Sequence, residues 1–223
     1  MIVSASPNQY HLHRMIKALF LIFEPGPTWE RIAEAGRGLA FIIVVYLLPM
    51  WFLVATAEGF GLMHWGTAQM NYGVTKKLTL NEVVLFETAR SLLLLLVIAT
   101  SAALIKWLGE TFHSRQNYTQ AFTVVAYGLS PLFLLQLLNV FPMPVWLVWA
   151  AGLLLALSTL YHGVPCVMKV DPTHALGLYF MSSLVVAALT ATERFFTAWY
   201  LSGHFAPLTN IAAQFAAKLP FSK

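Results

Sequence analysis

Glu87 and Arg90 are the residues of this sequence whose types and spacing most suggest chemistry. They stand three positions apart, beside the apolar run 91–105. On a helix this spacing places both side chains on one face, where their charges neutralise each other. An ionisable pair inside a membrane marks a functional site by default. At the outer interface, however, Arg90 would reach lipid headgroups and Glu87 would reach water, and the spacing leaves both alternatives open.

His162 is a second candidate, and Tyr127 joins it because both stand near expected kinks of neighbouring helices. A metal-binding or proton-relay role for His162 needs partners, but the other six histidines are scattered and form no HExxH or comparable spacing. A hydrogen-bonded structural histidine is therefore favoured over a metal ligand. Together, Glu87, Arg90, Tyr127 and His162 form the candidate intramembrane polar or partner site.

Motifs for catalysis are absent from this sequence. It contains no GxSxG, no GxxxxGK[ST] and no GxGxxG. Cys166 is its only cysteine, which excludes an intrachain disulfide, a zinc ribbon and a CxxC redox pair. The net charge of +4 is spread along the chain instead of forming a basic face, which argues against nucleic-acid binding. We therefore expect a non-enzyme with no catalytic residue, no cofactor and no metal.

The longest charge-free segment indicates the solvent that surrounds the chain. No Asp, Glu, Lys or Arg occurs in the 53 residues between Arg115 and Lys169, which turn at Pro142 and Pro144. One helix of that length would measure about 80 Å, whereas the hydrocarbon core is about 30 Å thick, so the segment crosses a bilayer twice. We predict an all-α fold, a polytopic membrane helical bundle with five transmembrane helices, at about 38–57, 82–106, 120–140, 145–168 and 172–192. The last extends beyond its charge-free part through Phe195, Phe196 and Trp199.

With five crossings, the chain divides into three parts. Residues 1–37 form a cytoplasmic N-terminal segment, 38–202 the five-helix domain and 203–223 an extracytoplasmic tail. Apolar residues within 12–23 recur at helical spacing, which predicts an amphipathic helix on the membrane surface or packed on the bundle. A sixth crossing in the tail is disfavoured by its glycine, proline and amide residues. Seven inner against five outer basic residues, Arg194 among the outer ones, favour an inside N-terminus.

Prolines and a glycine predict kinks in three of the five helices. Pro49 lies in the first, Pro131 in the third, and Gly163 with Pro165 in the fourth. An internal proline leaves an upstream carbonyl without its donor, and neighbouring helices or hydroxyl side chains re-satisfy that carbonyl in a membrane. A kinked bundle with few charges can form a groove for a lipid or for a partner's helix. It is a poor lining for a hydrated pore.

Three ordered motifs are similar to those of a known family. Residues 24–32 fit P-x-x-x-W-x-x-I, residues 126–131 read Ala-Tyr-Gly-Leu-Ser-Pro, and residues 160–169 approach LYxGxPxLMK. In this order they resemble the bacterial branch of the Yip family (Ypt/Rab-interacting proteins), with a likeness from about Glu24 to Leu189. The resemblance implies five transmembrane helices, a cytoplasmic N-terminus and no known catalytic residues.

Two functions from different classes fit these features. The first is a non-enzymatic scaffold or accessory subunit of a membrane or envelope complex, with the lipid bilayer and other membrane subunits, or a second copy of the chain, as partners. The alternative is a small transporter, channel or lipid-handling protein that uses polar residues of the kinked helices. Both predict a bacterial inner-membrane protein with a cytoplasmic N-terminus and a periplasmic C-terminus. The direction in which Glu87 and Arg90 face discriminates between them.

Overall fold

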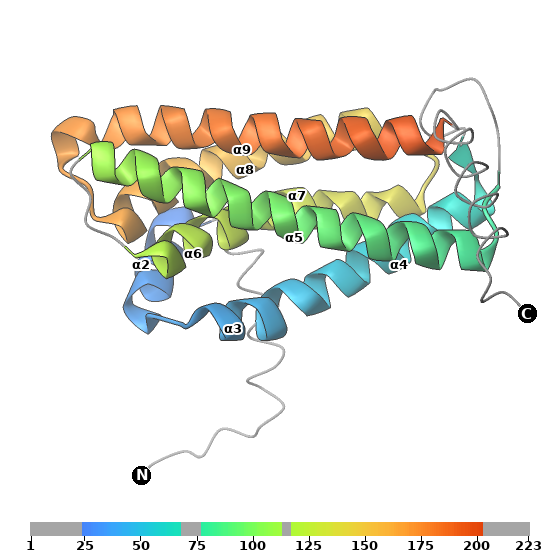
Figure 1. The fold of residues 1–223 in the computed structure, drawn as a ribbon, viewed down its shortest axis with the longest axis horizontal. Coiled ribbons are helices and arrows are strands. Elements are labelled where there is room, and N and C mark those ends of the chain that lie inside the picture. Colours follow the sequence, from blue (N-terminus) through green and yellow to red (C-terminus); the bar gives the residue numbers. More distant parts are fainter. Residues whose placement is uncertain (1–23, 68–76, 113–116, 203–223) are drawn as a thin grey trace, which may run out of the picture.

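The computed structural model describes residues 24–67, 77–112 and 117–202, which form helices and connecting turns but no strand. Short helices lie at the N-terminal side and around the third crossing, and four long helices make up most of the remainder (Figure 1). The elements are α2 (Pro25–Ala35), α3 (Leu39–Phe41), the π-helical segment η1 (Ile42–Leu47), α4 (Leu48–His64), α5 (Leu80–Thr111), α6 (Tyr118–Gly128), α7 (Ser130–Gln136), the 3-10 segment η3 (Leu137–Val140), α8 (Val145–Met168) and α9 (Pro172–Leu201).

Five helical stretches among the described residues are long and apolar enough to cross a membrane. The prediction of an all-α, five-helix membrane bundle is therefore confirmed. Two crossings extend further than the charge-free criterion indicated, because the helices continue through charged residues that lie inside the protein. The five stretches are Leu39–His64, Leu80–Thr111, Tyr118–Val140, Val145–Met168 and Pro172–Leu201.

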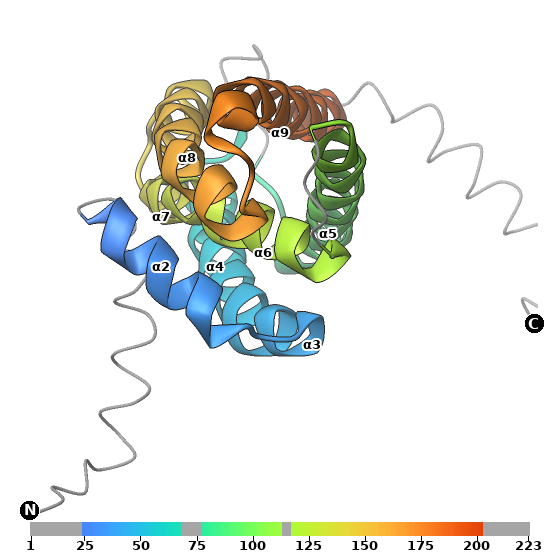
Figure 2. The ribbon, with the colours of Figure 1, turned by 90° about the vertical axis from the view of Figure 1, so that its left-hand side faces the viewer.

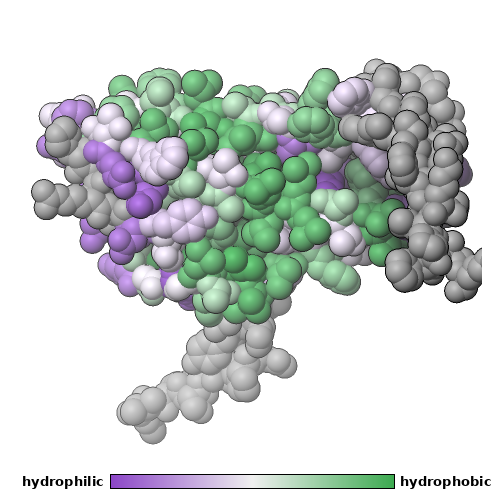
Figure 3. Space-filling model, in the orientation of Figure 1, coloured by the Kyte–Doolittle hydropathy of each residue, from purple (hydrophilic) through white to green (hydrophobic). Residues whose placement is uncertain are grey.

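The third crossing forms the centre of the bundle. In Tyr118–Val140, 78% of the most apolar stretch is buried, compared with 28% to 39% in the other four crossings. Figure 2 looks along the bundle and shows α6, the first part of this crossing, next to α5 and α8. The four outer helices therefore present apolar side chains outwards, and the lipid-facing surface is mostly hydrophobic (Figure 3). Hydrophilic residues gather instead at one end, where α2 and α6 lie (Figures 1 and 3).

Two helices begin at side-chain caps that the sequence encodes locally. At the start of α5, the Thr79 amide donates to Glu82 Oε2 at 2.8 Å, and the Glu82 amide donates to Thr79 Oγ1 at 3.5 Å. At the start of α6, the Asn117 amide donates to Gln120 Oε1 at 2.9 Å. Such reciprocal capping satisfies amides that have no partner within the helix. The caps therefore mark where these two helices begin.

Two of the prolines stand where the α-helix is interrupted. Pro49 lies in the first turn of α4, directly after the π-helical η1, and Pro131 lies in the first turn of α7, after the turn residue Leu129. Pro165, by contrast, lies inside α8, which continues to Met168.

Gly163 serves a close helix approach. A Cβ at this position would lie 2.5 Å from atoms of the Trp29 indole. Trp29, on α2, is fully buried, and its Nε1 donates to the Thr159 carbonyl of α8 at 3.0 Å. Helix α2 is thereby held against α8 by residues from two of the sequence motifs described above.

Some predictions fall outside the described residues. These are the amphipathic helix within 12–23 and the path of the tail after residue 202.

Arg194, which we counted among the outer charges, instead lies in α9 and is 1% exposed. Its burial removes one residue from the outer side of the charge balance.

Candidate functional site

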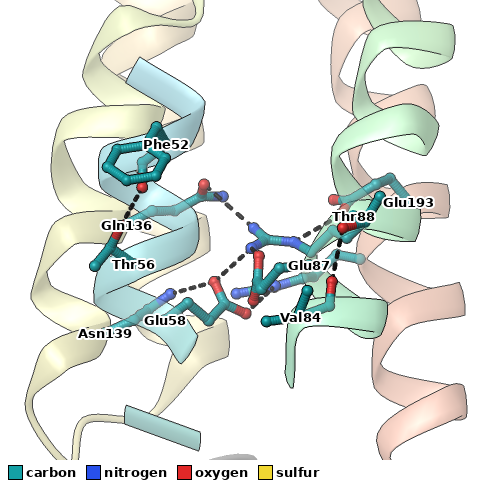
Figure 4. A network of polar contacts seen from close by, with 11 residues as sticks. Phe52, Thr56, Glu58, Val84, Glu87, Thr88, Gln136, Asn139 and Glu193 are labelled. Carbon is teal, nitrogen blue, oxygen red and sulfur yellow. Dashed lines mark hydrogen bonds and ion pairs between the residues drawn. The ribbon is translucent and has the colours of Figure 1, made fainter. Parts of the chain in front are cut away.

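Five charged side chains from three helices meet inside the bundle. Glu58 comes from α4, Glu87 and Arg90 from α5, and Glu193 and Arg194 from α9, and each is between 1% and 7% exposed. Figure 4 shows this charged network between α4 and α7 on one side and α5 and α9 on the other. The sequence separations of up to 136 residues mean that only the tertiary fold brings these groups together.

Arg90 is the centre of the charged network. Its Nη1 lies 2.8 Å from Glu58 Oε2 and 3.3 Å from Glu87 Oε2, and its Nε lies 3.3 Å from Glu193 Oε1. Its Nη2 donates to Gln136 Oε1 at 3.3 Å. The planar guanidinium offers five N–H donors in fixed directions, so a single arginine can bind several acceptors at once. Arg90 therefore joins α4, α7 and α9 to α5.

Glu58 is the second branching point of the charged network. Its Oε1 accepts from Arg194 Nη1 at 3.2 Å, and its Oε2 accepts from Asn139 Nδ2 at 2.9 Å as well as from Arg90. Asn139 lies in η3, where the 3-10 turn ends the third crossing. The carboxylate is thus surrounded by two guanidinium groups and an amide, which compensates for its removal from water.

The charged network is not fully paired. It contains three glutamates and two arginines, and three of its buried polar atoms have no hydrogen-bond partner: Glu87 Oε1, Asn139 Oδ1 and Arg194 Nη2. Buried polar atoms are normally satisfied, and an exception calls for a physical cause such as a bound ion or ligand. Glu87 stands out because it also lines a groove on the outside of the bundle.

That groove lies between α4 and α5 and has a volume of about 650 Å³. Its walls are mostly apolar, and Glu87 is the one charged residue among the described residues that line it. Figure 1 shows α4 close to the start of α5 and diverging from it towards α3. We call this the α4/α5 groove; its lining includes Trp51, Phe52, Ala55, Phe60, Leu92 and Leu95.

The structure buries Glu87 and Arg90 among the helices of the bundle. It does not bring Tyr127 or His162 into the charged network. The Tyr127 ring stacks on Tyr46 with centroids 4.3 Å apart, and the Ser130 hydroxyl hydrogen-bonds both the Tyr46 hydroxyl and the Tyr127 carbonyl. This aromatic contact joins η1 to the middle of the third crossing.

His162 lies on a separate pocket of about 420 Å³ between α2, α8 and α9, lined also by Glu30, Tyr161 and Cys166. Its ring packs edge-on against Tyr161, with centroids 5.2 Å apart. Within residues 24–67, 77–112 and 117–202, no three His, Cys, Asp or Glu side chains come close enough to hold a metal ion. The four predicted site residues therefore occupy three different places.

Sequence reasoning missed Glu58, Gln136, Asn139, Glu193 and Arg194. The charge-free criterion ended the first crossing one residue before Glu58 and the fifth one residue before Glu193. A usable signal was present, since the charges of the second crossing need opposite partners in lipid. Charged residues at the ends of the first and fifth crossings were the available partners on the same side of the membrane.

Comparison with known proteins gives one match. A family model described as the Yip1 domain matches residues 19–192. No curated protein and no solved structure matches the chain.

Proposed function

The chain belongs to the Yip1 domain family, and on that premise we propose that it acts without catalysis, as a scaffold or accessory subunit of a membrane complex. The proposal rests on the observation that the buried charges pair with one another across helices. Arg90 and Arg194 hold carboxylates of α4, α5 and α9 at 2.8 to 3.3 Å. These charges stabilise one arrangement of the helices, and the apolar outer faces remain available for partners.

The proposed orientation is a cytoplasmic N-terminus and a periplasmic C-terminus in a bacterial inner membrane. Basic residues of α2, of the end of α5 and of the α8–α9 turn support it, because they share the hydrophilic end of the molecule with α2. Short cytoplasmic connections are enriched in Lys and Arg. A green fluorescent protein fused after Lys223 should stay dark, since it does not mature after export; bright fluorescence would reverse this topology.

Site-specific photocrosslinking in native membranes tests the scaffold role. A photoreactive residue at Leu154 of α8 or Leu184 of α9, which are 69% and 64% exposed, should link to another membrane protein or to a second copy of the chain. The same residue at Val125, which is fully buried, is the control and should link only within the chain. Recovery of the lone chain from both exposed positions would contradict a scaffold or accessory role.

A lipid-handling protein is the second candidate, and the α4/α5 groove favours it. An apolar groove with one carboxylate on its wall suits an amphipathic molecule better than an inorganic ion. We expect the reconstituted chain to accelerate the exchange of fluorescent phospholipid between leaflets, and Thr56→Phe, in the groove, to abolish the acceleration. Leu154→Phe on α8 is the control. Exchange no faster than in protein-free vesicles would exclude this role.

A further inference from the structure

Two residues that line the α4/α5 groove, one on each wall, each carry a buried polar atom without a hydrogen-bond partner. Glu87 Oε1 on α5 and Trp51 Nε1 on α4 are buried and have no hydrogen-bond partner, although Glu87 Oε2 accepts from Arg90. Glu87 is 7% exposed and Trp51 is also 7% exposed. One atom is an acceptor and the other is a donor, so a ligand that satisfies both must carry a donor group and an acceptor group.

The spacing of charged residues along α5 bears on the depth of Glu87 in the membrane. The 19 residues from Glu87 to Lys106 of α5 span about 29 Å, which matches a hydrocarbon core of about 30 Å. Lys106 pairs with Glu110 at 3.5 Å, and both side chains are partly exposed, as expected of a membrane boundary. With one boundary placed at Lys106, Glu87 would lie at the opposite boundary, where headgroups meet acyl chains.

Trp51 lies deeper in the same leaflet. A Cβ added to Gly59 of α4 would lie 2.8 Å from a side-chain carbon of Val83 of α5, so these two residues are at one level. Because the helices are antiparallel, Trp51 is about 6 Å further from the boundary than Glu87. A phospholipid has its groups in this order, with the ester carbonyls below the headgroup.

The volume of the α4/α5 groove fits a lipid. Its lining runs along the α4 side from Ile43 to Met63, about 30 Å. The volume of about 650 Å³ is in the range of small-ligand pockets.

We infer that the α4/α5 groove binds one phospholipid whose primary ammonium headgroup pairs with Glu87, whose ester carbonyl accepts from the Trp51 N–H, and whose acyl chain lies on Phe52, Ala55 and Leu92. The ammonium supplies both missing elements of the charged network, a hydrogen-bond donor for Glu87 Oε1 and a cation for its excess carboxylate. The inference rests on the second candidate function and is independent of the scaffold role.

Native mass spectrometry of the full-length chain tests this inference directly. The chain, purified in dodecyl maltoside, is mixed with equal amounts of palmitoyl-oleoyl phosphatidylethanolamine, phosphatidylcholine and phosphatidylglycerol. We expect one tightly bound phosphatidylethanolamine per chain. Its preference over phosphatidylcholine, which has the same charge but no N–H, should be about tenfold, the contribution of one charge-assisted hydrogen bond. Equal retention of these two lipids would overturn the headgroup assignment.

Variants separate the headgroup contact from the groove itself. Glu87→Gln should make the retention of the two zwitterionic lipids equal, whereas Glu193→Gln, which removes a network carboxylate outside the groove, should keep the preference. Loss of the preference in Glu193→Gln as well would assign it to the charge of the network and overturn the contact with Glu87. Thr56→Phe should lower retention of all three lipids, and Leu154→Phe should not. Unchanged lipid retention in Thr56→Phe would exclude the groove as the binding site.

Crosslinking and exchange measurements separate lipid binding from helix docking and from lipid transfer between leaflets. A photoreactive residue at Ala55 should link to phospholipid in native membranes, and a link to protein instead would show that a helix occupies the groove. Lipid binding without accelerated exchange between leaflets would refute the second candidate function while leaving the binding site intact. Absence of a bound lipid in the purified chain, with exchange still accelerated, would refute the binding site alone.

Discussion

The charged network and the contact between α2 and α8 hold helices together by different means. The charged network joins α4, α5 and α9 through buried ionic groups with Arg90 at their centre. At the other end of the molecule, Trp29 packs on Gly163 and makes one hydrogen bond to Thr159. The charged network depends on several ionic partners being present at once. The α2–α8 contact depends on the absence of a side chain at Gly163.

This difference has a consequence for how each region tolerates change. A buried charge that loses its partner cannot be hydrated in lipid, so the free energy of the folded state rises steeply. A close approach that gains atoms can be relieved by small shifts of the helices. Substitutions in the charged network should therefore destabilise the protein more than substitutions at the α2–α8 contact.

Arg90→Ala should have the largest effect. It leaves Glu58, Glu87 and Glu193 without their shared cation, and we expect a loss of about 3–5 kcal/mol in the free energy of unfolding. Equilibrium unfolding in mixed micelles of dodecyl maltoside and dodecyl sulfate, followed by circular dichroism, measures it. Arg90→Lys is the control, and the retained charge should reduce the loss. Wild-type stability in Arg90→Ala would contradict the central role of this guanidinium.

Gly163→Ala should have the next largest effect. The added Cβ would lie 2.5 Å from the Trp29 indole, and overpacking of this kind costs about 1–3 kcal/mol. The same unfolding measurement applies. Gly26→Ala in α2 is the matched control, because a Cβ there meets no atom within 4 Å. A loss in Gly163→Ala as large as that in Arg90→Ala would erase the distinction between the two regions.

Tyr46→Phe should have a smaller effect than either, because it tests a neutral buried hydrogen bond. It removes the hydroxyl that pairs with Ser130 and keeps the ring stacked on Tyr127, so we expect a loss of about 0.5–1.5 kcal/mol. Tyr179→Phe is the comparison, since Tyr179 lines the peripheral pocket of His162. An effect above about 3 kcal/mol would place this hydrogen bond in the class of buried ionic groups.

Lys106→Met should have the smallest effect. Lys106 pairs with Glu110 at 3.5 Å, and both side chains are partly exposed. Exposed ion pairs contribute about 0.2–1 kcal/mol at most. Unfolding midpoints of Lys106→Met and Arg90→Ala measured side by side give the sharpest contrast between an exposed and a buried cation. Similar losses in the two variants would mean that burial does not decide the strength of these pairs.

The fold was predictable because its main constraint is local. Apolar segments of sufficient length must form helices in lipid, where each backbone N–H and C=O needs an internal partner. The 53 charge-free residues before Lys169 were sufficient to predict two crossings, and no information about the packing of other helices was needed. The same criterion failed at Glu58 and Glu193, because a charge marks the end of a crossing only when it faces water.

The candidate site was predictable only in part. The spacing of Glu87 and Arg90 placed them on one helix face and identified them as the pair to examine. Nothing in their own segment distinguished an inward face from a headgroup-facing one. The contacts of Arg90 with Glu58 and Glu193, 32 and 103 positions away in the chain, made that distinction.

The amino-acid sequence alone therefore determined the solvent, the helical class and the number of crossings, since these depend on hydropathy and length within single segments. The tertiary structure decided which helices are neighbours, where the three glutamates and two arginines meet, and which carboxylate oxygen remains without a partner beside the α4/α5 groove. Helical periodicity specifies the direction of a side chain around its own axis. The helix that lies in that direction is chosen by the packing of the whole bundle.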